Sequence, residues 1–194
     1  MSGAKVFAFL FTSLDGYHEG PGGSLGWGVY DEEFFEWNLR QSREVGALLL
    51  GRRTYEHFAE VWDGGEAAER LPEVAAFMNA VPKTVVTSGG HPLTPWEGSR
   101  SVDGSDLPAE IARLRRESTA GAPGSGGDVA VFGSSDLTVS LLEQGLVDEL
   151  RILVHPVLLG GGRSLFAGLK ERVELTPGAV TTFRSGNVLL RYRV

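Results

Sequence analysis

Residues 5–13 read Lys-Val-Phe-Ala-Phe-Leu-Phe-Thr-Ser, and this stretch decides the class of fold. Nearly every residue in it is apolar or favours extended structure. That pattern is typical of a strand buried on both faces of a sheet, rather than one with a face in water. We therefore predict a central strand here. It breaks at Leu14-Asp15-Gly16, and residues 20–24, Gly-Pro-Gly-Gly-Ser, predict a loop because they are rich in chain breakers.

Beyond this strand, predicted helices alternate with predicted strands. The helix expected over residues 31–43 has acids at its start and bases near its end, in line with its own dipole. Further helices are predicted over residues 55–62, 72–79 and 107–117, and another follows residues 133–135 and stops at Gly145. Strands are predicted over residues 47–50, 83–87, 128–132 and 148–157, with two closing strands over about 181–183 and 188–194. Residues 118–127 predict a surface loop. This order predicts a mainly parallel sheet with helices on both faces and an antiparallel edge at the C-terminal end.

The composition limits the classes of function. With 194 residues, 42% hydrophobic and 22% charged, the chain can bury one core, so we predict a single domain over residues 1–194. There are no cysteines, which excludes disulfides, thiolate zinc sites and cysteine nucleophiles. A net charge of −7 argues against a nucleic-acid partner. No stretch approaches the roughly 20 apolar residues that cross a bilayer, and the start shows no signal-peptide core, so we expect no membrane partner and a cytoplasmic location.

Ligands of open α/β sheets bind beyond the carboxyl ends of the strands, so the turns after the strands are the places to search. In the turn over residues 51–54, glycine permits close approach of a ligand, and Thr54 with the helix amides can hold phosphate. Arg52 and Arg53 can take a dianion. An ordinary turn with two solvated arginines explains the same residues about equally well.

Three other turns carry weaker signals. Residues 132–136 bring small residues and hydroxyls to a helix start, again an anion site, although Ser135 can equally be a plain N-cap. The turn at Thr87 and Ser88 can border a nucleotide's ribose or adenine, or be only a turn. Asp15 is either a turn former or a ligand contact.

Several common fingerprints are missing from the sequence. It contains no G-x-G-x-x-G, no Walker A sequence and no G-x-S-x-G. The histidines at positions 18, 57, 91 and 155 show no spacing that suits a metal. We expect them to be structural or on the surface, and we expect no metal site.

Taken in order, these segments resemble the dihydrofolate-reductase-like superfamily. The resemblance is greatest to the reductase domain of bacterial riboflavin biosynthesis, the RibD C-terminal domain, in a stand-alone form. It implies a three-layer α/β/α fold with a mixed, mainly parallel sheet. The matching segments span nearly the whole chain: residues 13–16 (SLDG), 49–55 (LLGRRTY), 82–88 (PKTVVTS), 131–134 (VFGS), 147–150 (VDEL) and 156–162 (PVLLGGG).

The resemblance also implies NADPH as the cofactor. The phosphates would lie near residues 51–54 and 133–136, the adenosine half by residues 87–88, and the nicotinamide against the end of the first strand. Two arginines favour NADPH over NADH, because only NADPH carries the extra phosphate. The implied cofactor-binding residues are Ser13, Leu14, Gly16, Gly51, Arg52, Arg53, Thr54, Thr87, Ser88, Phe132, Gly133, Ser134, Ser135, Asp136 and Leu137.

On the substrate side the resemblance implies contacts from Asp15, Ser24 and Trp27. The family's pterin-binding acid falls, by its spacing from Trp27, on Glu32, with Asp31 beside it. However, the proline that precedes this acid in folate reductases is missing, and only Lys83 stands in for the arginine that holds folate. The deaminase signature of bifunctional riboflavin enzymes is absent as well. We therefore expect a small heterocyclic substrate, pterin- or pyrimidine-like, or a carbonyl compound.

The expected reaction is hydride transfer from NADPH to a C=N or C=O carbon between the first strand and the helix over residues 31–43. The proton would come from water, Glu32 or Asp31, and an acid in this role would need its pKa raised by an apolar pocket with Trp27 and Phe35. Acids at a helix start are also expected from the helix dipole alone. The alternative is a non-catalytic protein that binds NADPH or another small ligand on the same fold.

The stretch over residues 150–159 is long and largely apolar. We expect it at or near an edge of the sheet, where a second copy of the chain would cover it in a homodimer built partly from the late strands and the loop over residues 158–166. The riboflavin-type reductases that this chain resembles pair through that part of the fold. Cover by helices of the same chain is the alternative.

Overall fold

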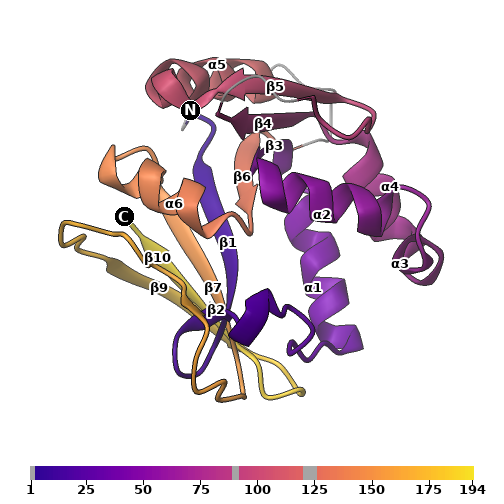
Figure 1. Ribbon diagram of the computed structural model, residues 1–194, viewed down its shortest axis with the longest axis vertical. Coiled ribbons are helices and arrows are strands. Elements are labelled where there is room, and N and C mark those ends of the chain that lie inside the picture. The colour runs from indigo at the N-terminus through magenta and orange to yellow at the C-terminus, as the bar shows by residue number, and fades with distance from the viewer. Residues whose placement is uncertain (1–2, 89–91, 120–125) are drawn as a thin grey trace.

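The computed structural model describes residues 3–88, 92–119 and 126–194. Its main feature is an eight-stranded sheet with the strand order β5-β4-β3-β6-β1-β7-β10-β9 (Figure 1). Strands β5 through β7 in this order run parallel, whereas β10 is antiparallel to both of its neighbours. The expected mixed sheet with an antiparallel C-terminal edge is confirmed. The strands are β1 (Val6–Ser13), β3 (Val45–Gly51), β4 (Lys83–Thr87), β5 (Ser99–Asp103), β6 (Asp128–Phe132), β7 (Glu149–His155), β9 (Thr176–Thr182) and β10 (Val188–Arg193).

Helices cover both faces of this sheet, so the three-layer fold is confirmed. On one face lie α1 (Glu32–Ser42), α2 (Arg52–Trp62) and α4 (Pro72–Ala80), and on the other lie α5 (Leu107–Thr119) and α6 (Ser135–Glu143) (Figure 1). The central strand shows why both faces are apolar. Phe7 and Phe9 of β1 belong to the first core, and Val6, Ala8 and Leu10 belong to the second.

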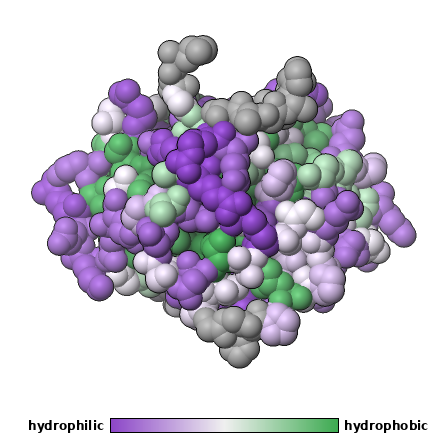
Figure 2. Space-filling view, turned by 90° about the horizontal axis from the view of Figure 1, so that it is seen from above, coloured by the Kyte–Doolittle hydropathy of each residue, from purple (hydrophilic) through white to green (hydrophobic). Residues whose placement is uncertain are grey.

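The helix α5 packs one face against the sheet and turns the other towards solvent. Its Leu107, Ile111 and Leu114 are buried against the sheet, at the spacing of one helical face. Figure 2 looks onto this end of the molecule and shows a surface that is mostly hydrophilic, with apolar side chains visible in smaller areas. None of the helices in the described ranges is both long and apolar enough to cross a membrane.

Short and polar elements escaped prediction. The sequence of β5, Ser-Arg-Ser-Val-Asp, lacks an apolar run because this edge strand is largely exposed. Strand β9 starts at Thr176 rather than near residue 181, and contains Pro177 and Gly178, which only an edge strand tolerates easily. The other unpredicted elements are β2 (Tyr17–Glu19), β8 (Arg163–Ser164) and α3 (Glu66–Arg70). Most of the predicted loop over residues 118–127 lies outside the described residues.

Residues 150–159 were expected at or near an edge of the sheet, but they do not form its edge strand. Strand β7 lies between β1 and β10, because the chain's last strand adds beside it. Helices and strands of the same chain therefore cover β7. The edge strand at this end is β9, whose Val180 is 63% exposed.

Candidate functional site

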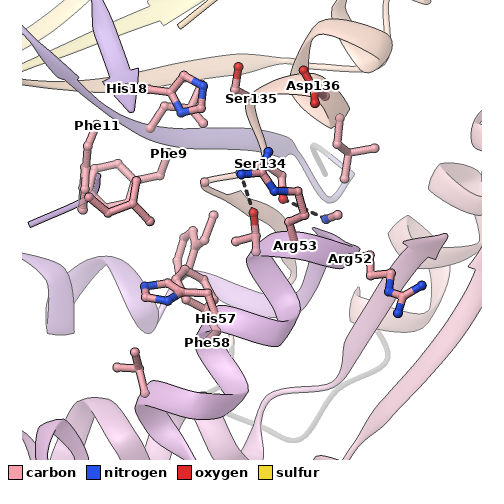
Figure 3. A pocket seen from close by; sticks show the side chains of 18 of the residues that line it. Phe9, Phe11, His18, Arg52, Arg53, His57, Phe58, Ser134, Ser135 and Asp136 are labelled. Atoms are coloured by element: carbon pink, nitrogen blue, oxygen red, sulfur yellow. Dashed lines mark hydrogen bonds between the residues drawn. The ribbon is translucent and has the colours of Figure 1, made fainter. Parts of the chain in front are cut away.

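Two turns that are far apart in the sequence meet at the carboxyl ends of β3 and β6. These strands are parallel neighbours, so the turns that follow them, residues 51–54 and 133–136, lie side by side. The backbone N–H of Gly51 donates to Ser134 Oγ over 2.8 Å, and the N–H of Ser134 donates to Thr54 Oγ1 over 3.1 Å (Figure 3). The two turns predicted as anion sites therefore form one interlocked unit.

The helices that begin at these turns have no side-chain caps. Neither α2, which follows Gly51, nor α6, which follows Ser134, has a side-chain hydrogen bond at its N-cap. In α1, by contrast, Asp31 Oδ1 accepts from the N–H of Phe34 over 2.8 Å. The first-turn amides of α2 and α6 thus remain for a partner outside the helix, and an anion is the partner that a helix N-terminus favours.

Gly133 sits at the crossing of the two turns. Its φ is +65°, and a Cβ built on it would lie 3.1 Å from Thr54 Cγ2. A side chain here would be strained by the backbone and would crowd the neighbouring turn. Glycine therefore keeps a cradle open between the two helix N-termini.

A single cavity of about 1170 Å³ extends from these turns into the helical layer. We call its polar part the mouth: residues 18–19, 51–54, 87–88, 103–105 and 133–136, with Arg163. The part of the wall that we call the chamber comes mainly from α1, α2 and α4: Phe9, Phe11, Leu25, Trp27, Tyr30, Phe34, Phe35, Asn38, Ser42, His57, Phe58, Val61, Trp62, Ala67, Val74, Phe77 and Met78. The wall also includes Leu10, Val86, Leu107, Phe132, Leu137, Ser140 and Leu165. Helix α2 runs from the mouth at Arg52 to Trp62, ten residues further on. At 1.5 Å per residue the far end of the chamber lies about 15 Å from the mouth.

The two arginines of the mouth do not act as a pair. Arg52 Nε lies 2.7 Å from Glu56 Oε1, whereas Arg53 lies 3.6 Å from Glu19 Oε1. Successive residues of a helix are turned by about 100°, so their side chains diverge. In Figure 3 the Arg53 side chain points towards the turn that contains Ser134, and that of Arg52 points away from it. The expected joint binding of one dianion by both guanidiniums is therefore not supported, and each arginine faces a different part of the mouth.

His18 is a residue of the site that the sequence did not reveal. It lies on β2 in the cavity wall, and its buried Nε2 has no hydrogen-bond partner among the described residues. Burial lowers the pKa of this imidazole, and the charges of Glu19, Arg163 and Asp136 also act on it. His18 is therefore a neutral ring in a mouth whose other charges are mostly paired. No spacing in the sequence indicates this position.

The end of β1 was expected to meet the nicotinamide, but its residues face another loop. Asp15 accepts from the N–H groups of Leu159 and Gly160, at 3.1 and 2.8 Å, and from Ser13 Oγ at 2.6 Å. These bonds, that from Ser13 first, lower the pKa of the Asp15 carboxyl. The turn former is thus the interpretation that the contacts favour. The cavity wall does not include Ser13, Leu14, Asp15 or Gly16.

The expected proton donors also lie outside the cavity wall. Glu32 is exposed. Asp31 accepts from the N–H of Phe34 and from that of Ser185, and these bonds, with Phe34 first, lower its pKa instead of raising it. A carboxylate held in this way is a poor proton donor at neutral pH. The structure agrees better with the interpretation that these acids cap and stabilise the start of α1 than with a role as proton donors.

Trp27 does line the chamber, as its expected contact with substrate requires. Ser24, the other expected contact, is exposed and lies outside the wall, where its carbonyl oxygen accepts from Trp27 Nε1 over 3.1 Å. Thr87, Ser88 and all the expected cofactor residues over 51–54 and 132–137 line the cavity.

Most of the chamber wall was not predicted. Phe9 and Phe11 of β1 and His57 and Phe58 of α2 lie on facing sides of the cavity (Figure 3). The sequence could have indicated that Phe9 and Phe11 lie together, because alternate residues of a strand share one face. The residues from α1, α2 and α4 come together only through helix packing.

A buried histidine supports the chamber from outside. His155 is fully buried, and its Nδ1 accepts from the N–H of Val29 over 3.2 Å, while Asn187 Nδ2 donates to the Val29 carbonyl over 2.7 Å. The rings of Trp27 and Tyr30 each lie 5.3 Å from the imidazole. Burial lowers the pKa of His155 to about 4 and raises that of Tyr30 to about 12, so both stay neutral at pH 7.

The chain is similar to known proteins over almost its full length. The family model for the RibD C-terminal domain matches residues 4–189. The uncharacterized protein YyaP of Bacillus subtilis is 26% identical over 189 residues, which cover 97% of this chain and 94% of YyaP.

Solved structures support the fold. A putative riboflavin biosynthesis protein from Shewanella sp. PV-4 matches with a TM-score of 0.74 and 21% identity, covering 98% of this chain and 99% of that one. A deaminase/uracil reductase from Thermotoga maritima matches with a TM-score of 0.69 and 15% identity, covering 98% of this chain and 56% of that one. A dihydrofolate reductase from Enterococcus faecalis, complexed with NADP(H), matches with a TM-score of 0.57 and 17% identity, covering 97% of this chain and 95% of that one.

Proposed function

This chain belongs to the RibD C-terminal domain family, and we propose that it is an NADPH-dependent reductase acting on a small substrate held in the chamber. The main observation in favour of this proposal is that one cavity combines a mouth suited to anions with an aromatic chamber. A cofactor and a substrate can meet in such a cavity, because helix α2 contributes residues to both parts. Reductases among the structural neighbours agree with this activity.

The residues of the mouth fit a pyridine nucleotide. The uncapped starts of α2 and α6 and the cradle at Gly133 suit a diphosphate, and the diverging arginines suit two phosphates at separate places. We propose that Arg53 binds beside the diphosphate, near Ser134, and that Arg52 binds the 2′-phosphate. Thr87 and Ser88 would border the adenosine. When bound, NADPH supplies the hydride.

The residues of the chain itself position the substrate and exclude water from it. Aromatic walls hold the reacting carbon of the substrate close to the mouth, and orientation of this kind accounts for much of an enzyme's rate gain. The wall of the chamber contains no carboxylate among the described residues. The proton therefore comes from water, to which the buried Nε2 of His18, unpartnered among the described residues, can hydrogen-bond.

The test has two stages. Binding of NADPH and NADH is measured first by cofactor fluorescence, and oxidation of NADPH is then followed at 340 nm with a panel of aldehydes, imines and pterins. We expect tighter binding of NADPH and turnover with at least one class. Binding without turnover on the whole panel would favour the non-catalytic alternative, and absence of NADPH binding would reject the proposal.

We also propose that the chain is a cytoplasmic homodimer. The surface that suggests a dimer is β9 and not β7. Strand β9 is an exposed edge strand, one side of which has no neighbouring strand among the described residues, and its Val180 is exposed. Light scattering at micromolar concentration is the test. A mass that stays at the 20.8 kDa of one chain on concentration would rule the dimer out.

A further inference from the structure

On the basis of the proposed reductase function, we infer that the chamber takes a flat, uncharged and largely apolar carbonyl or imine compound, such as an aromatic aldehyde or ketone. Charged pterins and phosphorylated pyrimidines are not its substrates. The inference concerns the chamber alone and leaves the mouth to the cofactor.

The wall of the chamber is a connected set of aromatic rings. Phe34 is at its centre, with ring centroids 6.0 Å from Phe11, 5.2 Å from Tyr30 and 5.5 Å from Phe35. Phe58, Trp62, Phe77 and the aliphatic Val61, Val74 and Met78 complete it. Walls of this kind favour a planar apolar ligand through burial and ring stacking.

Charged side chains at the cavity are confined to the mouth. Among the described lining residues they are Glu19, Arg52, Arg53, Asp103, Asp136 and Arg163, and the chamber has no Asp, Glu, Lys or Arg. Five of these six charges are already matched, because Glu19 pairs with Arg53 and Asp136 pairs with Arg163, while Arg52 pairs with Glu56 outside the wall. A charged ligand in the chamber would therefore be desolvated without a partner, which is strongly unfavourable.

Two acids that adjoin chamber residues in the sequence, Asp31 and Glu33, are engaged elsewhere. Asp31 accepts from the N–H of Ser185, and Glu33 Oε2 accepts from the N–H of Arg184 over 2.9 Å. Both carboxylates thus bind the turn between β9 and β10. The chamber therefore lacks the carboxylate that a protonated pterin ring would need as its counter-charge.

Two polar side chains of the chamber wall, Asn38 and Tyr30, are neutral donors that suit a carbonyl oxygen. Asn38 uses its Oδ1 to accept from Gln41 Nε2 over 3.3 Å, which leaves its Nδ2 to donate to a ligand. The Tyr30 hydroxyl is a second neutral donor in the wall. In the reaction, the hydride adds to the carbonyl carbon, the C=O π pair moves to oxygen, and that oxygen takes a proton, so the products are an alcohol and NADP⁺.

The test uses two aldehydes that differ by one carboxylate group, 2-naphthaldehyde and 6-formyl-2-naphthoate. Binding is read by quenching of tryptophan fluorescence, since Trp27 and Trp62 line the chamber, and turnover is read at 340 nm with NADPH. We expect at least about tenfold tighter binding of the neutral aldehyde, as the desolvation cost predicts. Equal binding of both compounds, or no binding of the neutral one, would overturn the inference.

Asn38→Asp is the matching variant, because it places a carboxylate in the chamber with almost no change of shape. We expect this variant to bind 2-naphthaldehyde more weakly. We also expect it to bind trimethoprim more strongly when binding is measured at acidic pH, where this diaminopyrimidine is a cation. Gln144→Glu, at an exposed position after α6, is the control for added charge and should change neither. An Asn38→Asp protein that folds and binds both probes as the wild type does would also contradict the inference.

The two proposals fail separately. NADPH binding, measured by its own fluorescence, tests the reductase function and does not depend on the aldehydes. If NADPH fails to bind while the neutral aldehyde binds selectively, the reductase function is wrong and the chamber's selectivity stands. If NADPH binds and the charged aldehyde binds equally well, only the inference about the substrate is wrong.

Discussion

In the mouth of the cavity backbone amides and polar side chains both offer binding groups, whereas in the chamber side chains provide nearly all of them. The mouth is built on two helix N-termini and a glycine cradle at the ends of parallel strands. The chamber consists of aromatic and aliphatic side chains from three helices and the segment before α1. Backbone amides at a helix start are the same in every sequence that forms the turn, but a wall of side chains changes with each substitution.

This difference suggests how one fold can keep its cofactor and change its substrate. Substitutions in the mouth should affect the cofactor, and substitutions in or behind the chamber should affect only the substrate or the stability. Four predictions test that separation, in order of decreasing effect.

The largest effect is expected from Gly133→Val. A β-branched side chain at a φ of +65°, with its Cβ 3.1 Å from Thr54, would fill the cradle between the helix starts. We expect NADPH affinity to fall about a hundredfold or more, and stability to fall by about 1–2 kcal/mol from backbone strain. Fluorescence titration and urea unfolding measure the two effects.

Gly145→Val is its matched control. Gly145 has a φ of +64°, and a Cβ there would meet nothing within 4 Å. It follows α6 at the end away from the mouth, so the variant should lose similar stability and keep its NADPH affinity. Normal NADPH binding by a folded Gly133→Val protein would show that the crossing of the two turns is only structural.

The second prediction concerns pH and the support of the chamber. The pKa of His155 falls from 6.5 to about 4 on folding, so the unfolded chain binds more protons between these values. Stability from this group is complete above pH 6.5 and is lost as the pH falls towards 4. At about 1.4 kcal/mol per pKa unit, the loss is about 3 kcal/mol.

Urea unfolding at several pH values measures this loss. His155→Gln should flatten the dependence between pH 6.5 and 4, because glutamine does not titrate and can still accept from the N–H of Val29. His18, whose pKa burial also lowers, should leave a smaller slope. An unchanged pH profile in the glutamine variant would remove His155 as its source.

The third prediction separates NADPH from NADH. Replacing both Arg52 and Arg53 with alanine should weaken NADPH binding by about ten- to hundredfold, since a charge-assisted contact contributes roughly 1.5–3 kcal/mol. NADH should lose less, because it has no 2′-phosphate. The control is Arg113→Ala on α5, where Arg113 pairs with Glu117 in the same helical spacing as Arg52 with Glu56. Equal losses for both cofactors would contradict the assignment.

The smallest effect is expected from Ser134→Ala. It removes the acceptor of the Gly51 N–H and loosens the junction of the two turns. We expect a loss of about 1 kcal/mol in stability and about a fivefold loss in NADPH affinity. Ser118→Ala removes a hydroxyl that donates to the Gly127 carbonyl over 2.6 Å, away from the mouth, and should lower stability alone. A cofactor effect of equal size in both variants would mean that the junction has no special role.

The fold followed from the sequence wherever an element is buried in a regular way. Strands β4 and β6 were predicted with their observed bounds, and β1 and α1 within one residue at each end, because their apolar patterns or end charges are local signals. The edge strands β5 and β9 gave no such signal, since an exposed strand needs no apolar face.

The mouth could likewise be predicted in part from local sequence, whereas the chamber could not. The glycines and hydroxyls of residues 51–54 and 133–136 indicated anion-binding turns because a helix start is a local structure. Tertiary structure alone decided which carboxylates were free. Asp15 is held by Gly160, 145 residues away, and Asp31 by Ser185, 154 residues away. Long-range contacts likewise turned His18 into the cavity and set the aromatic wall, because three helices must pack together before their side chains enclose a space.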